Sequence, residues 1–154
     1  MNYYFIYNNF LKQYPQNEWN SRYILVAPDA GSAKTVKAYS EVLGIDNIIC
    51  DKTRDYSRPN TVMQTRYVGY SSLFKNKIGI IIDDMVDTLG TMCACVRELV
   101  DDGLKSAIVV ATHGVLSGSA IKNINSTNEI SMVIVTNTLP QNDNIAQCAK
   151  LSVV

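Results

Sequence analysis

Residues 80–91 read Ile80-Ile81-Ile82-Asp83-Asp84-Met85-Val86-Asp87-Thr88-Leu89-Gly90-Thr91. A run of isoleucines stops at two adjacent carboxylates. A short loop with a third carboxylate, two hydroxyls and a glycine follows, and an amphipathic segment then begins. This order predicts a buried strand, an anion-binding loop, and a helix whose positive N-terminus faces that loop. In open α/β sheets, ligands bind at such strand ends.

The residue types of this loop also predict the kind of ligand. Backbone amides, together with the hydroxyls of Thr88 and Thr91, can donate hydrogen bonds to a phosphate. Asp83 and Asp84 can meet sugar hydroxyls or bind a hard cation. A sugar phosphate would bind both sets of groups, its phosphate to the amides and hydroxyls and its sugar hydroxyls to the carboxylates. The alternative is a strand–turn–helix whose Asp87 only caps the helix, but capping leaves the other two carboxylates unexplained.

The rest of the chain alternates between β-branched runs and amphipathic segments. The expected strands cover residues 23–27, 47–50, 78–82, 107–111, 130–135 and 151–154, and the expected helices cover residues 32–43, 92–102 and 119–124. Continuous β-branched strands that alternate with helices predict a mostly parallel central sheet with helices on both faces. We therefore expect a three-layer α/β fold.

The composition predicts one soluble globular domain. Hydrophobic residues make up 47% of the 154 residues, enough for a core, and 14 basic residues balance 14 acidic ones. The balance gives no broad positive field that would favour nucleic acid. No apolar run approaches membrane-spanning length and no signal-peptide pattern opens the sequence. We expect no nucleic-acid or membrane partner and a cytoplasmic location.

The cysteines do not form a metal-binding pattern. They are Cys50, Cys93, Cys95 and Cys148, without a C-x-x-C pair, and the one histidine, His113, is far from them in the sequence. A zinc site is therefore not expected. We interpret all four as reduced residues that contribute to packing.

The first twenty residues are rich in aromatic side chains. At helical spacing they form an apolar stripe made of Tyr3, Tyr7, Phe10, Leu11 and Tyr14. One interpretation is a helix that packs against its own domain. The other is an exposed contact surface for a partner, because aromatic residues are enriched in interface cores. We expect residues 1–20 to form an aromatic-rich segment that joins a further domain or contacts a partner, and residues 21–154 to form the domain itself.

A polar stretch interrupts the alternation between Lys52 and Thr65. It contains Pro59 and several basic residues, among them Lys52 and Arg54. A solvated connection is one interpretation. A polar loop of this length inside a compact domain is, however, more often a lid or a binding element.

Five motifs, over roughly residues 22 to 153, resemble those of ribose-phosphate pyrophosphokinase (phosphoribosyl pyrophosphate synthetase) in order and spacing. They are Ala27-Pro28-Asp29-Ala30-Gly31-Ser32-Ala33-Lys34, Asp51-Lys52-Thr53-Arg54, the loop Asp83 to Thr91, Ala111-Thr112-His113-Gly114-Val115-Leu116-Ser117-Gly118, and Val135-Thr136-Asn137-Thr138-Leu139-Pro140-Gln141. The loop alone is also similar to the phosphoribosyl pyrophosphate motif of type I phosphoribosyltransferases. The resemblance implies a type I phosphoribosyltransferase-like fold. It covers only the C-terminal half of the enzymes of this family.

The resemblance also implies an activity used in nucleotide biosynthesis and a role for each motif. The family transfers diphosphate from ATP to ribose 5-phosphate, giving phosphoribosyl pyrophosphate and AMP. The ribose 5-phosphate site would consist of Asp83, Asp84, Asp87, Thr88, Leu89, Gly90 and Thr91. The pyrophosphate site would consist of Asp29, Ala30, Gly31 and Ser32, with Asp29 also binding Mg²⁺. Lys52 and Arg54 would be catalytic and would close over the transition state.

Two departures from the family leave alternatives open. Ser32 stands where the family commonly has a second glycine, and the N-terminal domain that contributes much of the nucleotide site has no counterpart here. We therefore expect the chain to form a homo-oligomer or to bind a partner chain that supplies the other half, with negligible activity alone. One alternative is a phosphoribosyltransferase that uses phosphoribosyl pyrophosphate, against which Lys52-Thr53-Arg54 and Thr112-His113-Gly114 argue. Another is a non-catalytic, sugar-phosphate-binding regulatory subunit.

Overall fold

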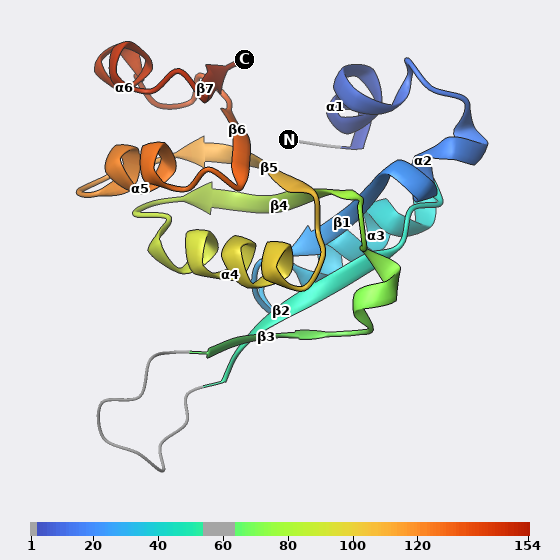
Figure 1. Ribbon diagram of the computed structural model, residues 1–154. Coiled ribbons are helices and arrows are strands. Elements are labelled where there is room, and N and C mark those ends of the chain that lie inside the picture. The colour runs from blue at the N-terminus through green and yellow to red at the C-terminus, as the bar shows by residue number, and fades with distance from the viewer. Residues whose placement is uncertain (1–2, 54–63) are drawn as a thin grey trace.

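The computed structural model describes residues 3–53 and 64–154, and within these residues seven strands form one sheet. The strand order is β3-β2-β1-β4-β5-β6-β7, with β3 antiparallel to β2 and the other neighbours parallel (Figure 1). The strands are β1 Tyr23–Ala27, β2 Asn47–Thr53, β3 Gln64–Val68, β4 Ile78–Val86, β5 Ser106–Gly114, β6 Ile130–Val135 and β7 Leu151–Val153.

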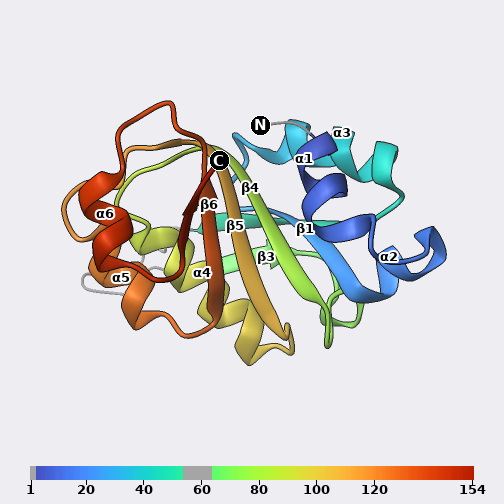
Figure 2. The same ribbon diagram turned by 90° about the horizontal axis from the view of Figure 1, so that it is seen from above.

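Helices cover both faces of the sheet. They are α1 Tyr3–Ile6, the π-helical turn η1 Tyr7–Leu11, α2 Gln16–Arg22, α3 Ala33–Leu43, the 3₁₀ turn η2 Ser71–Leu73, α4 Gly90–Asp101, α5 Ala120–Ser126 and α6 Asn142–Gln147. Figure 2 shows α1 and α3 on one side of the strands and α4 and α5 on the other.

The alternation of side chains along the central strands builds two cores. In β4, Ile80 and Ile82 pack with the N-terminal helices and α3, while Ile81 packs with α4 and α5. All three side chains are buried. This pattern explains why the strands are apolar on consecutive residues, and it confirms the predicted three-layer α/β fold.

The predicted elements are confirmed, but the central strands are longer than predicted. The apolar run was expected to end the strand at residue 82, whereas β4 continues to Val86. The extension follows from pairing with β5, because Met85 lies opposite His113 and Val86 opposite Gly114. Asp83 and Asp84 therefore lie within β4 rather than after it.

Four elements of the described residues, β3, α6, α2 and η2, are not predicted by the apolar pattern of the sequence. β3 is an edge strand with a largely polar sequence, and it pairs antiparallel to β2, for example at Cys50 and Tyr67. Its backbone hydrogen bonds do not depend on the apolar pattern used to find the other strands. β2 also runs to Thr53, so the predicted polar connection is shorter than expected. Residues 54–63, including Arg54, lie outside the described residues.

The N-terminal segment packs against its own domain. Phe10 and Leu11 are 9% and 0% exposed, so the prediction of an exposed stripe was wrong for these two residues. The physical reason is the π-helical turn, in which the Lys12 amide donates to the Tyr7 carbonyl at 2.9 Å and shifts the helical register. Of the two interpretations, the helix packed on its own domain is therefore right for Phe10 and Leu11. Tyr7 remains 39% exposed.

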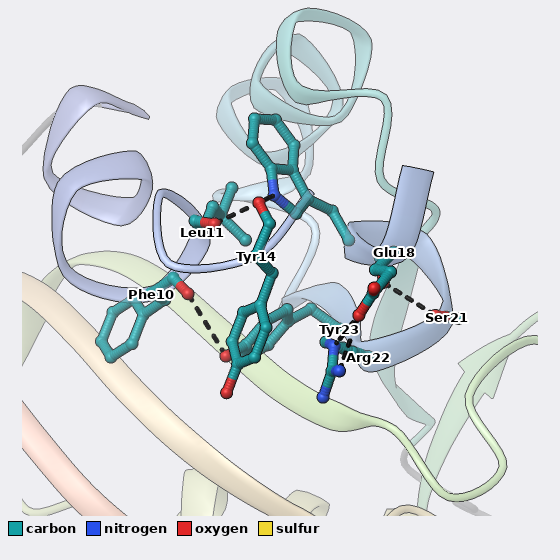
Figure 3. Close-up of polar contacts among 8 residues, drawn as sticks. Phe10, Leu11, Tyr14, Glu18, Ser21, Arg22 and Tyr23 are labelled. Atoms are coloured by element: carbon teal, nitrogen blue, oxygen red, sulfur yellow. Dashed lines mark hydrogen bonds and ion pairs between the residues drawn. The ribbon is translucent and has the colours of Figure 1, made fainter. Parts of the chain in front are cut away.

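Polar contacts fix this segment to the start of β1. The Trp19 indole N–H donates to the carbonyls of Leu11 and Tyr14, both at 3.0 Å. The Tyr23 hydroxyl donates to the Phe10 carbonyl at 3.4 Å, and the Arg22 guanidinium lies 4.0 Å from the centre of the Tyr14 ring (Figure 3). These contacts make residues 3–22 part of the folded domain.

The four cysteines are unpaired and buried, which confirms their predicted packing role. The Cys50 thiol and burial together raise the pKa of Cys95, so this thiol stays protonated. Within residues 3–53 and 64–154, no helix is long and apolar enough to span a membrane.

Candidate functional site

Two adjoining cavities lie at the carboxyl ends of β1 and β4. The first has a volume of about 290 Å³ and is lined by Asp29, Gly31, Ser32, Thr35, Tyr39, Ile82, Asp83, Asp84 and Thr112. The second has a volume of about 210 Å³ and is lined by Pro28, Asp29, Asp83, Met85, Val86, Asp87, Thr88, Leu89, Gly90, Thr91 and Met92. Asp29 and Asp83 line both cavities. The structure therefore brings the two loops predicted from the sequence to one continuous site.

The β4–α4 loop presents amides to the second cavity. Helix α4 begins at Gly90 without a side-chain cap. The amides of Gly90, Thr91 and Met92 therefore have no acceptor within the helix, and all three residues line the cavity. First-turn amides and the helix dipole favour an anion at this position.

Leu89 gives the loop its shape. Its φ is 58°, a left-handed conformation that a leucine rarely adopts, and its side chain is only 5% exposed in the apolar core. Such conformations persist where the surrounding structure holds them, and they cluster at ligand sites. Leu89 was predicted as a binding residue. The structure gives its side chain a packing role, and Leu89 also lines the second cavity.

In the β1–α3 loop, backbone amides donate hydrogen bonds to a carboxylate of the same loop. Asp29 Oδ1 accepts hydrogen bonds from the Gly31 amide at 2.8 Å and the Ser32 amide at 3.2 Å. The Ser32 hydroxyl donates back to the Asp29 carbonyl at 3.2 Å. Two of the amides predicted to bind pyrophosphate are thus bound to Asp29 in this structure. Ala30, the other predicted residue of this loop, lines neither cavity.

The shared wall between the cavities is acidic. Burial, followed by the charges of Asp29 and Asp84, raises the pKa of Asp83 to about 6, against the lowering effect of the Asp84 backbone. The Asp84 amide donates to Asp83 Oδ1 at 2.9 Å. The repulsion between clustered carboxylates of this kind is reduced by a cation or by hydrogen-bond donors on a ligand.

The carboxylates at the cavities suit Mg²⁺ only if water and substrate phosphates complete its coordination shell. Among the described residues, no group of three or more His, Cys, Asp or Glu could hold a metal by itself. Mg²⁺ usually takes one or two carboxylates and completes its shell with water and substrate phosphates. Asp29, which lines both cavities, fits this requirement.

Several residues at the site were not predicted to bind a ligand. Thr35, Tyr39 and Thr112 line the first cavity. Ser117 and Asn123 contact the β4–α4 loop from the next strand–helix unit. Thr35 could have been found from its place one turn after Ser32 on a predicted helix. Ser117 lies in the motif of residues 111–118, which did not indicate its contact with Asp87, and Asn123 carries no comparable sequence signal.

His113, from the motif of residues 111–118, lines neither cavity, and the predicted catalytic residues are not placed. His113 Nδ1 lies 3.0 Å from the Thr138 hydroxyl, which agrees with a structural hydrogen bond. Lys52 belongs to β2, and its side chain, like the whole of Arg54, lies outside the described residues.

Comparison with known proteins places these features among phosphoribosyl synthetases. The family model of the phosphoribosyl synthetase-associated domain matches residues 67–154. Ribose-phosphate pyrophosphokinase 2 of Schizosaccharomyces pombe is 38% identical over 131 residues, which cover 85% of this chain and 39% of that protein. Ribose-phosphate pyrophosphokinase 3 of Saccharomyces cerevisiae is 40% identical with the same coverage. The chain thus spans about two fifths of these relatives.

Solved structures show the same likeness. The phosphoribosylpyrophosphate synthetase from Mycobacterium smegmatis superposes with a TM-score of 0.77 at 32% identity, over 99% of this chain and 44% of that one. The adenine phosphoribosyltransferase from Trypanosoma brucei, solved with AMP, pyrophosphate and ribose 5-phosphate, has a TM-score of 0.54 at 16% identity, over 85% of this chain and 63% of that one. At this identity, the second likeness shows the shared fold alone.

Proposed function

Because this chain belongs to the phosphoribosyl synthetase-associated family, we propose that it forms the sugar-phosphate half of a ribose-phosphate pyrophosphokinase. The reaction would transfer diphosphate from ATP to ribose 5-phosphate and release phosphoribosyl pyrophosphate and AMP for nucleotide synthesis. The observation that carries the proposal is the pair of cavities that share Asp29 and Asp83. One cavity offers uncapped helix amides for a phosphate, and the other offers carboxylates for a cation, which would in turn bind a diphosphate.

Ribose 5-phosphate would bind across the shared wall. Its phosphate would lie in the second cavity, against the amides of Gly90 and Thr91 and the hydroxyls of Thr88 and Thr91. The sugar hydroxyls would then point toward Asp83 and Asp84, which line the first cavity. An ionised carboxylate accepts such hydrogen bonds strongly.

The diphosphate would occupy the first cavity, next to the β1–α3 loop. If Asp29 turns from the Gly31 and Ser32 amides toward Mg²⁺, these amides become free to hold phosphate oxygens. Mg²⁺, when bound, would neutralise phosphate charge. The protein's own part is to hold the anomeric hydroxyl and the β-phosphorus in line, which is the main source of catalysis in phosphoryl transfer.

Lys52 and Arg54 remain our candidates for stabilising transition-state charge. A donor of this kind is typically worth about 10²–10³ in rate. We expect Lys52→Ala to reduce turnover of the active assembly far more than ribose 5-phosphate affinity or melting temperature. A large loss of melting temperature with little change in rate would show a structural role instead.

The chain spans 39% of the length of its curated relatives, and we propose that residues outside these 154, on the same polypeptide or on a partner chain, supply the nucleotide half. The four unpaired cysteines support a reducing compartment such as the cytosol.

The proposed function is tested by supplying a nucleotide half as a separate polypeptide. The chain is mixed with ATP, Mg²⁺ and ribose 5-phosphate, with and without the N-terminal half of a ribose-phosphate pyrophosphokinase as a separate polypeptide. Mass spectrometry should detect AMP and phosphoribosyl pyrophosphate only in the mixture, and calorimetry should show that the chain alone binds ribose 5-phosphate. Absence of ribose 5-phosphate binding at millimolar concentration would contradict the proposal. Robust AMP formation by the chain alone, as a monomer, would contradict the shared nucleotide site.

A further inference from the structure

The β5–α5 connection and helix α5 contact three consecutive residues, the last residue of β4 and the first two residues of the β4–α4 loop. The amides of Val115 and Leu116 both donate to the Val86 carbonyl, at 2.9 and 3.2 Å. The Ser117 hydroxyl donates to the Asp87 carboxylate. Asn123 Nδ2 then donates to the Thr88 carbonyl at 2.8 Å. We call these four donor residues the β5–α5 clasp.

Asn123 is the member of the clasp whose contacts reach furthest toward the helix N-terminus. Its side-chain amide also lies 3.1 Å from the Ser119 hydroxyl, which fixes its orientation on α5. A Cβ placed on Gly90 would lie 3.9 Å from Asn123 Nδ2. The side chain thus stands beside the first residue of α4.

The loop needs an external support of this kind. Leu89, directly after Thr88, has a φ of 58°, and Leu116 of the clasp has a φ of 47°. Both leucines are buried in the same apolar core cluster. These two leucines have a left-handed backbone conformation in neighbouring loops. Core packing and the hydrogen bonds of the clasp hold them in it.

We propose that Asn123 is a positioning residue for the sugar-phosphate site. By fixing the Thr88 carbonyl, it fixes the peptide units that carry the Thr88 hydroxyl and the first amides of α4. Those groups line the phosphate cavity, whereas Asn123 itself does not. The inference rests on the proposed function, because it takes ribose 5-phosphate as the ligand.

The test compares two asparagines of the same helix. Asn123→Asp keeps the shape of the side chain, but an ionised carboxylate cannot donate to the Thr88 carbonyl and would repel it. Asn125→Asp is the matched control, because Asn125 Nδ2 donates to the Gln147 carbonyl at 2.9 Å, away from the loop. By calorimetry on the full chain, we expect roughly tenfold weaker ribose 5-phosphate binding for Asn123→Asp and less than about twofold for Asn125→Asp. Asn123→Gln, which keeps the amide donor, should recover most of the affinity.

A second readout separates positioning from folding. Amide hydrogen exchange of Cys93, whose amide donates to the Leu89 carbonyl at 2.8 Å, should be faster in Asn123→Asp than in Asn125→Asp, while the two melting temperatures stay similar. Equal losses of affinity and melting temperature in both variants would reduce Asn123 to a helix-packing residue and overturn the inference. So would unchanged binding in Asn123→Asp. If the unmodified chain binds no ribose 5-phosphate, the proposed function itself has failed.

Discussion

The β1–α3 and β4–α4 loops are the same kind of strand–loop–helix unit, but they are held in opposite ways. The β1–α3 loop is closed from within, because Asp29 accepts the amides of Gly31 and Ser32. The β4–α4 loop is held from outside, by Ser117 and Asn123 of the neighbouring unit. Neither α3 nor α4 has a side-chain cap, so the difference lies in the loop amides, which only the β1–α3 loop binds with its own carboxylate.

On the proposed function, this difference separates a site that is preformed for its ligand from one that must open. The β4–α4 loop would receive a phosphate without moving, so little binding energy would be lost in ordering it. In the β1–α3 loop, phosphate oxygens would compete with the Asp29 carboxylate for the same amides. We therefore expect ribose 5-phosphate to bind without Mg²⁺, and pyrophosphate to need a cation that draws Asp29 away.

The largest effect on ligand affinity is expected from removing the threonine hydroxyls of the β4–α4 loop. Thr88→Val with Thr91→Val should weaken ribose 5-phosphate binding at least about 100-fold, since each hydrogen bond to a charged group contributes roughly 1.5–3 kcal/mol. Calorimetry measures the loss. Thr35→Val, which alters the first cavity, is the control and should change the affinity less than about twofold. Equal affinities for the double variant and the unmodified chain would remove the β4–α4 loop as the phosphate site.

The next largest effect concerns the loop that must open. Asp29→Asn keeps an oxygen that accepts from the Gly31 and Ser32 amides but loses the charge, so binding of pyrophosphate with Mg²⁺ should fall roughly 10- to 100-fold. Asp29→Ala frees the amides as well. Without Mg²⁺, pyrophosphate should therefore bind Asp29→Ala more tightly than Asp29→Asn in the same calorimetric assay. The reverse order would mean that the carboxylate does not compete for these amides.

The sequence was informative where the chemistry is local. The order of carboxylates, hydroxyls and glycine between Asp83 and Thr91 predicted a loop that lines one cavity. The clasp could not be predicted from local sequence, because Ser117 and Asn123 are 30 and 35 residues from the groups that they contact. Such contacts depend on the pairing of β4 with β5, which no local pattern records.

The misplaced elements have similar causes. Pairing with β5 carried β4 past the apolar run, so Asp83 and Asp84 became part of the strand. At the N-terminus, the helical stripe was recognised, but its direction depended on one π-helical bond at Lys12. Periodicity thus identified the apolar residues without giving the face that they cover.

A smaller effect is expected from the pH dependence of the shared wall. Asp83, with a pKa of about 6, is mostly protonated at pH 5 and mostly ionised at pH 7. If the ionised form accepts the sugar hydroxyls, ribose 5-phosphate affinity should rise roughly tenfold over this range. The ligand's phosphate also titrates near pH 6, so Asp83→Asn serves as the reference. A rise of the same size in both proteins would come from the ligand alone.

The smallest effect is on the stability of the unligated protein. The folded state holds the Asp83 proton up to about pH 6, whereas the unfolded chain releases it near the ordinary value of 3.8. The stabilisation is therefore complete below about pH 4 and is lost as the pH rises through 6. Because Asp83 is half-buried, we expect a decrease in melting temperature of only about 2–4 °C relative to Asp83→Asn. Calorimetric scans between pH 4 and pH 7 would show parallel curves if the shift is absent.

The central claim, a preformed phosphate site at the β4–α4 loop, is tested most directly by nuclear magnetic resonance. The ¹⁵N-labelled chain is titrated with ribose 5-phosphate in the absence of Mg²⁺. The largest amide shifts are expected at Gly90 and Thr91, with smaller changes at Gly31 and Ser32, whose amides stay bound to Asp29. Dominant shifts at Gly31 and Ser32, or no shift at Gly90 and Thr91 at millimolar ligand, would contradict the account.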